Sequence, residues 1–245
     1  MKYQDNYAAG RPQMYDKKSR EEKAKRMVIL LGKYFDKEKL KKLTLLDVGA
    51  STGIIGNYLA QYFRSVTVAD IDKQAIEFAG KEFKKKNLSF KVDDAMNLSF
   101  KDNTFDIVIC THVYEHVPNP RKLFSEIYRV LKPNGVCYLA AINSLWPMEP
   151  HYDLPFLSYL PKRIANTYVR LFNKANEYYE TPANWWQLKK LTNKFVVNEY
   201  TAKIFQNPAN YGYLNIPKAL YPVSFLLSPL LKFLAPTFFW LLIKK

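Results

Sequence analysis

Short apolar runs alternate with amphipathic segments through the middle of the chain. Runs rich in Val, Ile, Leu and Phe predict strands at residues 44–49, 65–70, 88–92, 104–111 and 135–142. Between them, apolar residues recur at helical spacing and predict helices at residues 52–63, 73–86 and 120–131. Because strands and helices alternate, we expect an α/β fold with a Rossmann-like, doubly wound and mostly parallel sheet, whose ligands bind at the carboxyl ends of the strands.

The first predicted turn has the character of a nucleoside-binding site. Gly49 and Gly53 follow the first apolar run and allow the backbone to turn sharply beside a ligand. Asp70 ends the second apolar run, where a carboxylate can accept hydrogen bonds from both ribose hydroxyls. The glycines give G-x-S-x-G, with Ser51 in the middle, rather than the dinucleotide pattern G-x-G-x-x-G, and no P-loop follows.

At these residues the chain resembles the class I S-adenosylmethionine-dependent methyltransferases. Asp47, Gly49 and Gly53 match the family's first motif, and Ser51 replaces its middle glycine. Residues 88–143 resemble the small-molecule members, such as the ubiquinone and menaquinone C-methyltransferases. The resemblance implies S-adenosyl-L-methionine as cofactor and a seven-stranded sheet with an antiparallel last strand. It implies these cofactor-binding residues: Asp47, Gly49, Ser51, Gly53, Asp70, Ile71, Asp94, Ala95 and Thr111.

Each acidic residue also has a simpler explanation. Asp70 could cap the helix that starts near Asp72, and Asp47 could merely end a strand. Asp93 precedes Asp94, so either of the two could face the ligand. In the resembling family the adenine amino group meets the residue that corresponds to Asp94, together with the backbone at Ala95 and Met96.

We divide the chain into four parts of one domain. They are an N-terminal arm and cover helix (1–42), a cofactor-binding core (43–142), an acceptor-binding insertion (143–193) and the last strands with an apolar crossover helix (194–245). The arm, residues 1–18, should order over the cofactor and contains Tyr3, Tyr7, Arg11 and Tyr15. The cover helix should extend to about residue 42, with its apolar face inward: Met27, Leu30, Leu31 and Tyr34.

The insertion is rich in proline and aromatic residues and should contain helices at 161–173 and 182–193. Its side chains could line an apolar acceptor pocket or equally pack onto the sheet: Trp146, His151, Tyr152, Phe156, Trp185 and Trp186. An oxygen or carbon acceptor gains from a base near neutral pH, and the chain has three histidines. We prefer His116, His151 and Tyr152 as catalytic candidates over His112, although a histidine after a buried strand often only packs.

The C-terminal segment permits two interpretations. Residues 221–243 are apolar and long enough to cross a bilayer, but they contain three prolines and Lys232. The resemblance instead implies a sixth strand at 195–205, a helix at 217–234 and a buried antiparallel strand at 237–243, with Pro236 at the start of that strand. The helix has more Leu and Phe than a soluble crossover needs, so shallow docking at a membrane surface stays open.

Charge and cysteine content narrow the partners and the compartment. The net charge is +15, and residues 1–42 hold thirteen Lys or Arg against six Asp or Glu. A solvated helix face, an anionic membrane surface and nucleic acid could each account for this excess. Cys110 and Cys137 fall at offset positions on expected neighbouring strands, so we expect no disulfide and a cytoplasmic location, with peripheral contact at the inner membrane face as an option. No Cys/His cluster has metal-ligand spacing, so no metal is expected.

These features favour methyl transfer to a small or lipid-linked acceptor, at oxygen or carbon. The sequence after the fourth strand, Cys110-Thr111-His112-Val113, lacks the [DN]-P-P-[YF] motif of base N-methylation, and no Pro-Cys pair is present for cytosine C-methylation. Nucleic acid is therefore disfavoured as the acceptor. Two alternatives remain: an RNA methyltransferase that uses the basic N-terminal region, which RNA gel shifts would detect, and a non-catalytic S-adenosylmethionine-binding protein. The pattern assigns no oligomeric state.

Overall fold

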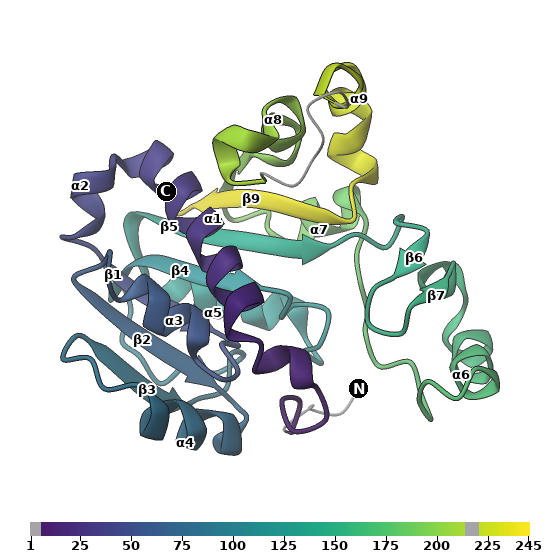
Figure 1. Cartoon of the computed structure of the whole chain (residues 1–245), viewed down its shortest axis with the longest axis horizontal. Coiled ribbons are helices and arrows are strands. Elements are labelled where there is room, and N and C mark those ends of the chain that lie inside the picture. Colours follow the sequence, from purple (N-terminus) through teal and green to yellow (C-terminus); the bar gives the residue numbers. More distant parts are fainter. Residues whose placement is uncertain (1–5, 214–220) are drawn as a thin grey trace.

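A seven-stranded sheet forms the centre of the computed structural model, which describes residues 6–213 and 221–245 (Figure 1). Its strand order is β3-β2-β1-β4-β5-β9-β8. The first five strands in the chain pair in parallel, and β9 is antiparallel to both of its neighbours. The strands are β1 (Thr44–Val48), β2 (Ser65–Asp70), β3 (Leu88–Val92), β4 (Phe105–Thr111), β5 (Leu131–Ile142), β8 (Val196–Glu199) and β9 (Thr237–Ile243). The predicted fold class is confirmed.

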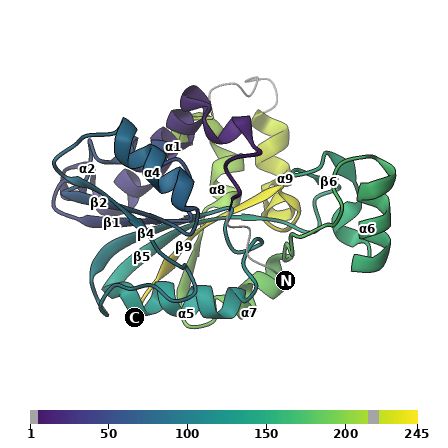
Figure 2. The ribbon, with the colours of Figure 1, turned by 90° about the horizontal axis from the view of Figure 1, so that it is seen from below.

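Helices cover both faces of this sheet (Figure 2). One face carries α1 (Lys17–Phe35), α3 (Ile54–Leu59), α4 (Lys73–Glu82) and α8 (Thr201–Gln206), and the other carries α5 (Pro120–Val130) and α7 (Trp185–Leu191). The remaining elements are η1 (Pro12–Met14), α2 (Lys37–Leu40), β6 (Met148–Glu149), β7 (Leu154–Pro155), η2 (Leu157–Tyr159), α6 (Lys162–Leu171), η3 (Pro208–Tyr211) and α9 (Tyr221–Leu234). Both faces are therefore buried, which explains why the central strands are apolar throughout.

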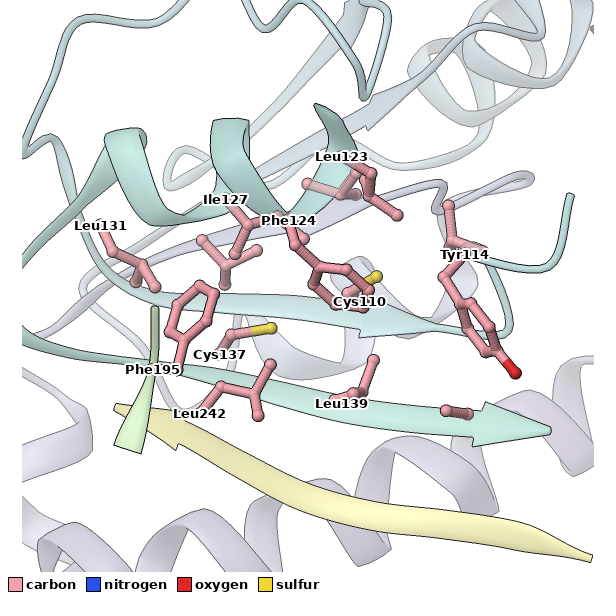
Figure 3. Packing of buried hydrophobic residues seen from close by; sticks show 14 of the residues in the cluster. Cys110, Tyr114, Leu123, Phe124, Ile127, Leu131, Cys137, Leu139, Phe195 and Leu242 are labelled. Atoms are coloured by element: carbon pink, nitrogen blue, oxygen red, sulfur yellow. The ribbon is translucent and has the colours of Figure 1, made fainter. Parts of the chain in front are cut away.

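The core beneath α5 shows how the central strands are packed (Figure 3). Leu123, Phe124 and Ile127 recur at helical spacing on α5 and are at most 2% exposed. They pack in one cluster with the strand residues Cys110 and Cys137, which are both free and fully buried. Cys137 pairs with Val108 rather than with Cys110, so the predicted offset is confirmed and there is no disulfide between them.

Several boundaries differ from the sequence prediction for identifiable reasons. The cover helix ends at Phe35, because Asp36 adopts a φ of 73° and then caps α2 through Glu38 N–H. The expected strand at 195–205 ends at Glu199, whose carboxylate accepts from Thr201 N–H (2.8 Å) and starts α8 instead. That part of the prediction was wrong, because a short acid cap outweighed the apolar pattern.

The C-terminal segment forms a helix and a central strand. As predicted, β9 follows Pro236 and is buried between β5 and β8. The helix predicted from residue 217 is seen as α9, and residues 217–220 of the prediction lie outside the described residues. Within residues 6–213 and 221–245, no helix has both the length and the apolar character needed to cross a bilayer.

Candidate active site

A cavity of about 430 Å³ opens at the carboxyl ends of β1, β2 and β4. Its wall combines the glycine turn, the acidic residues after β2 and β3, the N-terminal arm and the start of the insertion. The residues that line it include Tyr7, Arg11, Gln13, Met14, Arg20, Gly49, Ser51, Asp70, Ile71, Asp94, Ala95, Thr111, His112, His116, Trp146 and His151. A cavity of this size and position can hold a nucleoside-sized ligand.

The turn after β1 can only be built with glycine at its first position. Gly49 has a φ of 65°, and a Cβ there would lie 2.5 Å from Val113 Cγ2. Gly53 also has a positive φ, 71°, and precedes α3 as its N-cap. Ser51, between them, has a φ of 51°, and its N–H donates to Asp70 Oδ2. The turn thus brings bare backbone against the cavity, as the motif predicted.

Asp70 is fixed at the end of β2 by two backbone donors. Its Oδ2 accepts from Ser51 N–H (2.7 Å) and its Oδ1 accepts from Asp72 N–H (2.8 Å). Burial raises the pKa of Asp70, and these backbone N–H groups partly oppose the shift. Asp72, rather than Asp70, caps α4 by accepting from Ala75 N–H (3.0 Å). The helix-cap explanation therefore belongs to Asp72, and both Asp70 oxygens keep lone pairs for a ligand in the cavity.

The two neighbouring acids after β3 have different tasks. The Asp93 carboxylate is held by Ser99, whose N–H and Oγ donate to it, the latter at 2.7 Å. Asp94 accepts from Met96 N–H through Oδ1 (2.8 Å), which tightens the turn that lines the cavity beside Ala95. Both acids border the cavity. Because the side chain of Asp93 is occupied by the Ser99 loop, Asp94 is the better candidate for ligand contact.

Asp47 lies under the site, next to a half-buried arginine. The side chain is 2% exposed, its Oδ2 has no hydrogen-bond partner among the described residues, and it does not line the cavity. Burial raises the pKa of Asp47 to about 7, although nearby Arg20 acts against the shift. Burial likewise lowers the pKa of Arg20, which also contacts Met14 Sδ and does line the cavity. The sequence analysis did not single out Arg20, because its pairing partner lies 27 positions away on another element.

The N-terminal arm is attached across the mouth of the cavity. Ala8 N–H donates to Asp72 Oδ2 (3.2 Å), and Thr52 Oγ1 donates to Met14 O (2.7 Å). Tyr7 and Arg11 line the cavity as expected for an arm over the ligand. Two further aromatic residues of the predicted arm lie elsewhere: Tyr15 packs against Phe78, and Tyr3 is outside the described residues.

The catalytic candidates from the sequence analysis separate into two groups. His116 and His151 meet at the cavity, with ring centroids 4.8 Å apart and rings nearly perpendicular. Tyr152 is buried, its hydroxyl donates to Glu177 O (3.4 Å), and it does not line this cavity. Burial also raises the pKa of Tyr152 far above its usual range, so the hydroxyl stays protonated at neutral pH and is not available as a base. His112 lines the cavity from the turn after β4, with a φ of 54°.

Only part of the aromatic insertion reaches the cavity. Trp146 and His151 line it. Trp185 packs on Trp240 and Phe233, and Trp186 stacks on Phe233 with ring planes 9° apart. Phe156 is 58% exposed and Tyr152 belongs to a small separate core. The packing explanation therefore applies to three of the six residues proposed from the sequence, Tyr152, Trp185 and Trp186, whereas Phe156 neither lines this cavity nor is buried.

Three buried glutamates surround the histidine pair and were missed in the sequence. Glu149 accepts from the His151 ring through Oε1, 2.7 Å from Nδ1. Glu180 Oε1 lies 3.5 Å from His116 Nδ1 and 3.8 Å from Arg11 Nη2. Glu115 is fully buried beside them. The sequence offered two hints: Glu149 and Glu180 each lie in an aromatic part of the insertion, and Glu115 directly precedes His116. No local pattern showed that these three segments meet in the fold.

The electrostatics of this cluster follow from burial and mutual contact. Burial lowers the pKa of His116 to about 4, which leaves the ring neutral at pH 7. Burial would also lower the pKa of His151, but the hydrogen bond to Glu149 raises it above its ordinary value. Burial alone would raise the pKa of Glu115, and the neighbouring histidine rings hold it below its ordinary value. The lowered pKa favours an ionised carboxylate at Glu115, although this side chain is fully buried.

A second cavity of about 360 Å³ adjoins the first beneath α1. The two share wall residues that include Thr111, His112, Pro236 and Thr237. The rest of its wall is mostly apolar and aromatic, from Met27, Tyr138, Ala140, Ile204, Phe205, Tyr213 and Phe239. Arg20, Lys23 and Arg26 of α1 face it. Part of the basic excess near the N-terminus therefore borders the cavities: Arg20 and Arg26 are half-buried, whereas Lys23 is also exposed to solvent.

Most of the parallel part of the sheet lies within a stretch that matches a known family. Residues 46–139 match the family model described as a methyltransferase domain. The chain carries a class I methyltransferase domain. It is 30% identical to the ubiquinone biosynthesis O-methyltransferase of Coxiella burnetii over 45% of this chain and 49% of that protein. It is 31% identical to the protein of the same name from Rickettsia canadensis over 58% of this chain and 61% of that protein. The chain thus spans about half to three fifths of these relatives.

Solved structures support the same fold over nearly the whole chain. The methyltransferase domain and its flanks align with a Haloferax volcanii protein solved in complex with the Trm112 methyltransferase activator, at a TM-score of 0.63 and 15% identity, covering 99% of this chain and 98% of that one. They also align with the YcgJ protein of Bacillus subtilis at a TM-score of 0.53 and 18% identity, covering 88% and 94%. The predicted resemblance to class I methyltransferases is confirmed.

Proposed function

We propose that this protein transfers the methyl group of S-adenosylmethionine to an oxygen or carbon atom of a small or lipid-linked acceptor. The observation that carries the proposal is the Asp70 carboxylate, held by Ser51 N–H and Asp72 N–H at the rim of a cavity of about 430 Å³. Its position at the end of the second strand suits two ribose hydroxyls. Nothing in this arrangement suits a nucleotide phosphate, because the turn lacks a P-loop.

The cavity residues fit the cofactor along its whole length. Asp70 would hold the ribose, and Asp94 with the backbone at Ala95 would meet the adenine amino group. The Arg20 guanidinium would attract the cofactor's carboxylate, while Gly49 leaves room for its amino-acid end. When bound, the cofactor supplies a methyl group already activated by a sulfonium. The chain's own task is then to orient the acceptor and exclude water.

The acceptor would lie between the histidine pair and the second cavity. His116, His151 and Trp146 line one end of the main cavity, and the apolar second cavity joins it at Thr111 and His112. A ring that carries a hydroxyl could lie against the histidines while an apolar chain extends into the second cavity. The names of the quinone-biosynthesis relatives support an aromatic acceptor with an isoprenoid chain.

Helix α9 supports delivery of such an acceptor from a membrane surface. Its polar side is turned inward, where Ser228, 1% exposed, accepts from Gln206 Nε2 of α8 (3.1 Å). Its outward side is apolar, with Val223, Phe225, Leu226, Leu227, Leu230 and Leu234 between 39% and 78% exposed. This is the reverse of a soluble surface helix. Trp186, stacked beside it on Phe233, and the positive net charge suit an anionic lipid interface.

Transfer of a radiolabelled methyl group tests the activity. The purified protein is incubated with methyl-labelled S-adenosylmethionine and with cell extract divided into lipid, RNA and small-molecule fractions. We expect label in the lipid or small-molecule fraction, and none with Asp70→Ala. Label in RNA would favour the RNA alternative, and binding without any transfer would favour a non-catalytic cofactor-binding protein.

Co-sedimentation with vesicles tests the membrane contact separately. We expect the protein to pellet with phosphatidylglycerol vesicles, and Leu226→Glu to reduce the bound fraction at least about tenfold. The control is Leu171→Glu, which changes an equally exposed leucine (75% against 78%) on α6. Equal binding by both variants would refute docking through α9 and leave methyl transfer untouched.

A further inference from the structure

We propose that Glu115, His116 and His151 form a binding site for a divalent transition-metal cation at the acceptor end of the cavity. Each residue offers one ligand atom, and these atoms all lie within 4.8 Å of one another. Two imidazoles and a carboxylate are a common set of ligands for zinc, manganese, iron and cobalt. The sequence showed no such cluster, because Glu115 and His116 lie between β4 and α5 whereas His151 comes from the insertion.

The buried carboxylates are an independent sign that a cation belongs here. Glu115 and Glu180 are both 0% exposed, and none of their four carboxylate oxygens has a hydrogen-bond partner among the residues that the structure describes. An ionised carboxylate without a partner is among the most unfavourable groups to bury. With Glu149, also buried, the cluster holds three acids against one nearby arginine, Arg11. A bound dication would remove this imbalance.

The surrounding positive groups do not satisfy these acids. Arg11 Nη2 is 3.8 Å from Glu180 Oε1, beyond hydrogen-bond distance. Lys162 is near, but its Nζ donates to the backbone oxygens of Tyr178 and Glu180 rather than to a carboxylate. The His112 ring approaches Glu115 Oε1 only to 3.7 Å. The charge of the acids is therefore only partly balanced by the chain itself.

The outer contacts of the cluster match those of metal sites. His151 Nδ1 is 2.7 Å from Glu149 Oε1, which fixes the ring and directs Nε2 away from that carboxylate. A carboxylate that holds the second nitrogen of a ligating histidine is the usual arrangement around zinc. Ligand atoms bonded to one cation at about 2.0–2.2 Å lie about 3–4.4 Å apart. The three ligand atoms here, all within 4.8 Å of one another, need to move by up to about 1 Å to close on a cation.

A cation at this point would also have a use in the reaction. The site borders the same cavity as Trp146, at the end proposed for the acceptor. A hydroxyl oxygen bound to a divalent cation loses its proton to water more readily, which makes it a better nucleophile at neutral pH. This role rests on the proposed methyl transfer, whereas the binding of the cation does not. In this arrangement His116 and His151 act as ligands rather than as bases.

Direct titration with Mn²⁺ alone tests the site. The full chain, free of any polyhistidine tag and treated with a chelator, is titrated with Mn²⁺ while electron paramagnetic resonance measures the free ion. We expect one strong site per chain. Glu115→Gln and His151→Gln should each weaken it at least about 100-fold, and Glu149→Gln about 10–100-fold. The matched control, Glu38→Gln on the exposed helix α2, should bind as the unmodified protein does.

Binding of S-adenosylhomocysteine in the same samples separates the possible failures. Variants that bind it normally are folded, so their loss of Mn²⁺ binding is local. Normal S-adenosylhomocysteine binding with no Mn²⁺ site, or with a site unaffected by Glu115→Gln and His151→Gln, would overturn the metal site and leave the proposed function intact. One Mn²⁺ site without any S-adenosylhomocysteine binding would support the metal site and contradict the proposed function.

Discussion

Replacement of Gly49 by alanine should weaken both the fold and the cofactor site. The residue has a φ of 65°, and its new Cβ would lie 2.5 Å from Val113 Cγ2 and 3.0 Å from Cγ1. A left-handed conformation disfavours an L-residue by roughly 1–2 kcal/mol. Forced overpacking in a buried place adds about 1–3 kcal/mol. Alanine also lowers the conformational entropy of the unfolded chain, which offsets about 0.4–1 kcal/mol of this destabilisation. We therefore expect the free energy of unfolding to fall by about 2–4 kcal/mol.

A second glycine provides the matched control. Gly80 lies inside α4, has no positive φ, and a Cβ there would meet nothing nearer than Phe90 Cδ2 at 3.9 Å. Gly80→Ala should therefore stabilise the protein by about 0.5–1 kcal/mol, because alanine favours a helix interior. The two variants make the same chemical change and should move stability in opposite directions.

Urea denaturation of the ligand-free protein measures both effects, and Val113→Ala separates their causes. Without the Val113 methyl groups the clash is removed and only the strained φ remains. Gly49→Ala should then cost about 1–3 kcal/mol less in the Val113→Ala background than in the unmodified protein. If Gly49→Ala leaves stability unchanged, or if its cost is the same in both backgrounds, the close approach of Val113 to the turn is refuted.

Three further outcomes follow from charged residues of the site. Asp70→Ala should raise the Kd for S-adenosylhomocysteine at least about 100-fold, because it removes two charge-assisted hydrogen bonds worth about 1.5–3 kcal/mol each; isothermal calorimetry measures it. Arg20→Met should raise the same Kd about tenfold or more by removing the guanidinium beside Asp47 that lines the cavity and would attract the cofactor's carboxylate. Because burial raises the pKa of Asp47 to about 7, the folded state holds a proton that the unfolded state releases near pH 4, so stability should fall as pH rises from 4 to 7. Between pH 5 and pH 8, the free energy of unfolding of Asp47→Asn, measured by urea denaturation, should therefore rise by about 2–3 kcal/mol relative to that of the unmodified protein. A difference that stays constant over this pH range would contradict the raised pKa of the buried carboxyl.

The sequence predicted what depends on short-range pattern. The first two strands, the glycine turn between them and Asp70 all lie within one stretch of about thirty residues, where spacing alone determines which groups share an edge of the sheet. The last strand was also placed correctly, but from the resemblance to class I methyltransferases, which implied an antiparallel strand after Pro236.

The parts that failed depend on contacts between distant segments. Glu180 meets His116 from 64 positions away, and no local pattern indicates that the insertion folds back over the turn after β4. Arg20 had no local signal that distinguished it from the other basic residues of 1–42, and its interaction with Asp47 depends on how α1 packs against the sheet. Trp185 and Trp186 are residue types that often line apolar pockets, yet both pack against Phe233 of α9 instead. Composition identifies the chemistry that a side chain can perform, but tertiary packing decides whether it faces a ligand.

The insertion of β9 between β5 and β8 has a consequence for synthesis on the ribosome. β5 is complete at Ile142, but the strand that pairs with its outer edge begins only at Thr237, so the 94 residues between them must be made first. At typical elongation rates this takes roughly 5–20 s. During that interval the nascent chain presents an unpaired apolar strand edge, a template for aggregation. We therefore expect newly made chains to depend on chaperones that shield this edge until the last strand emerges.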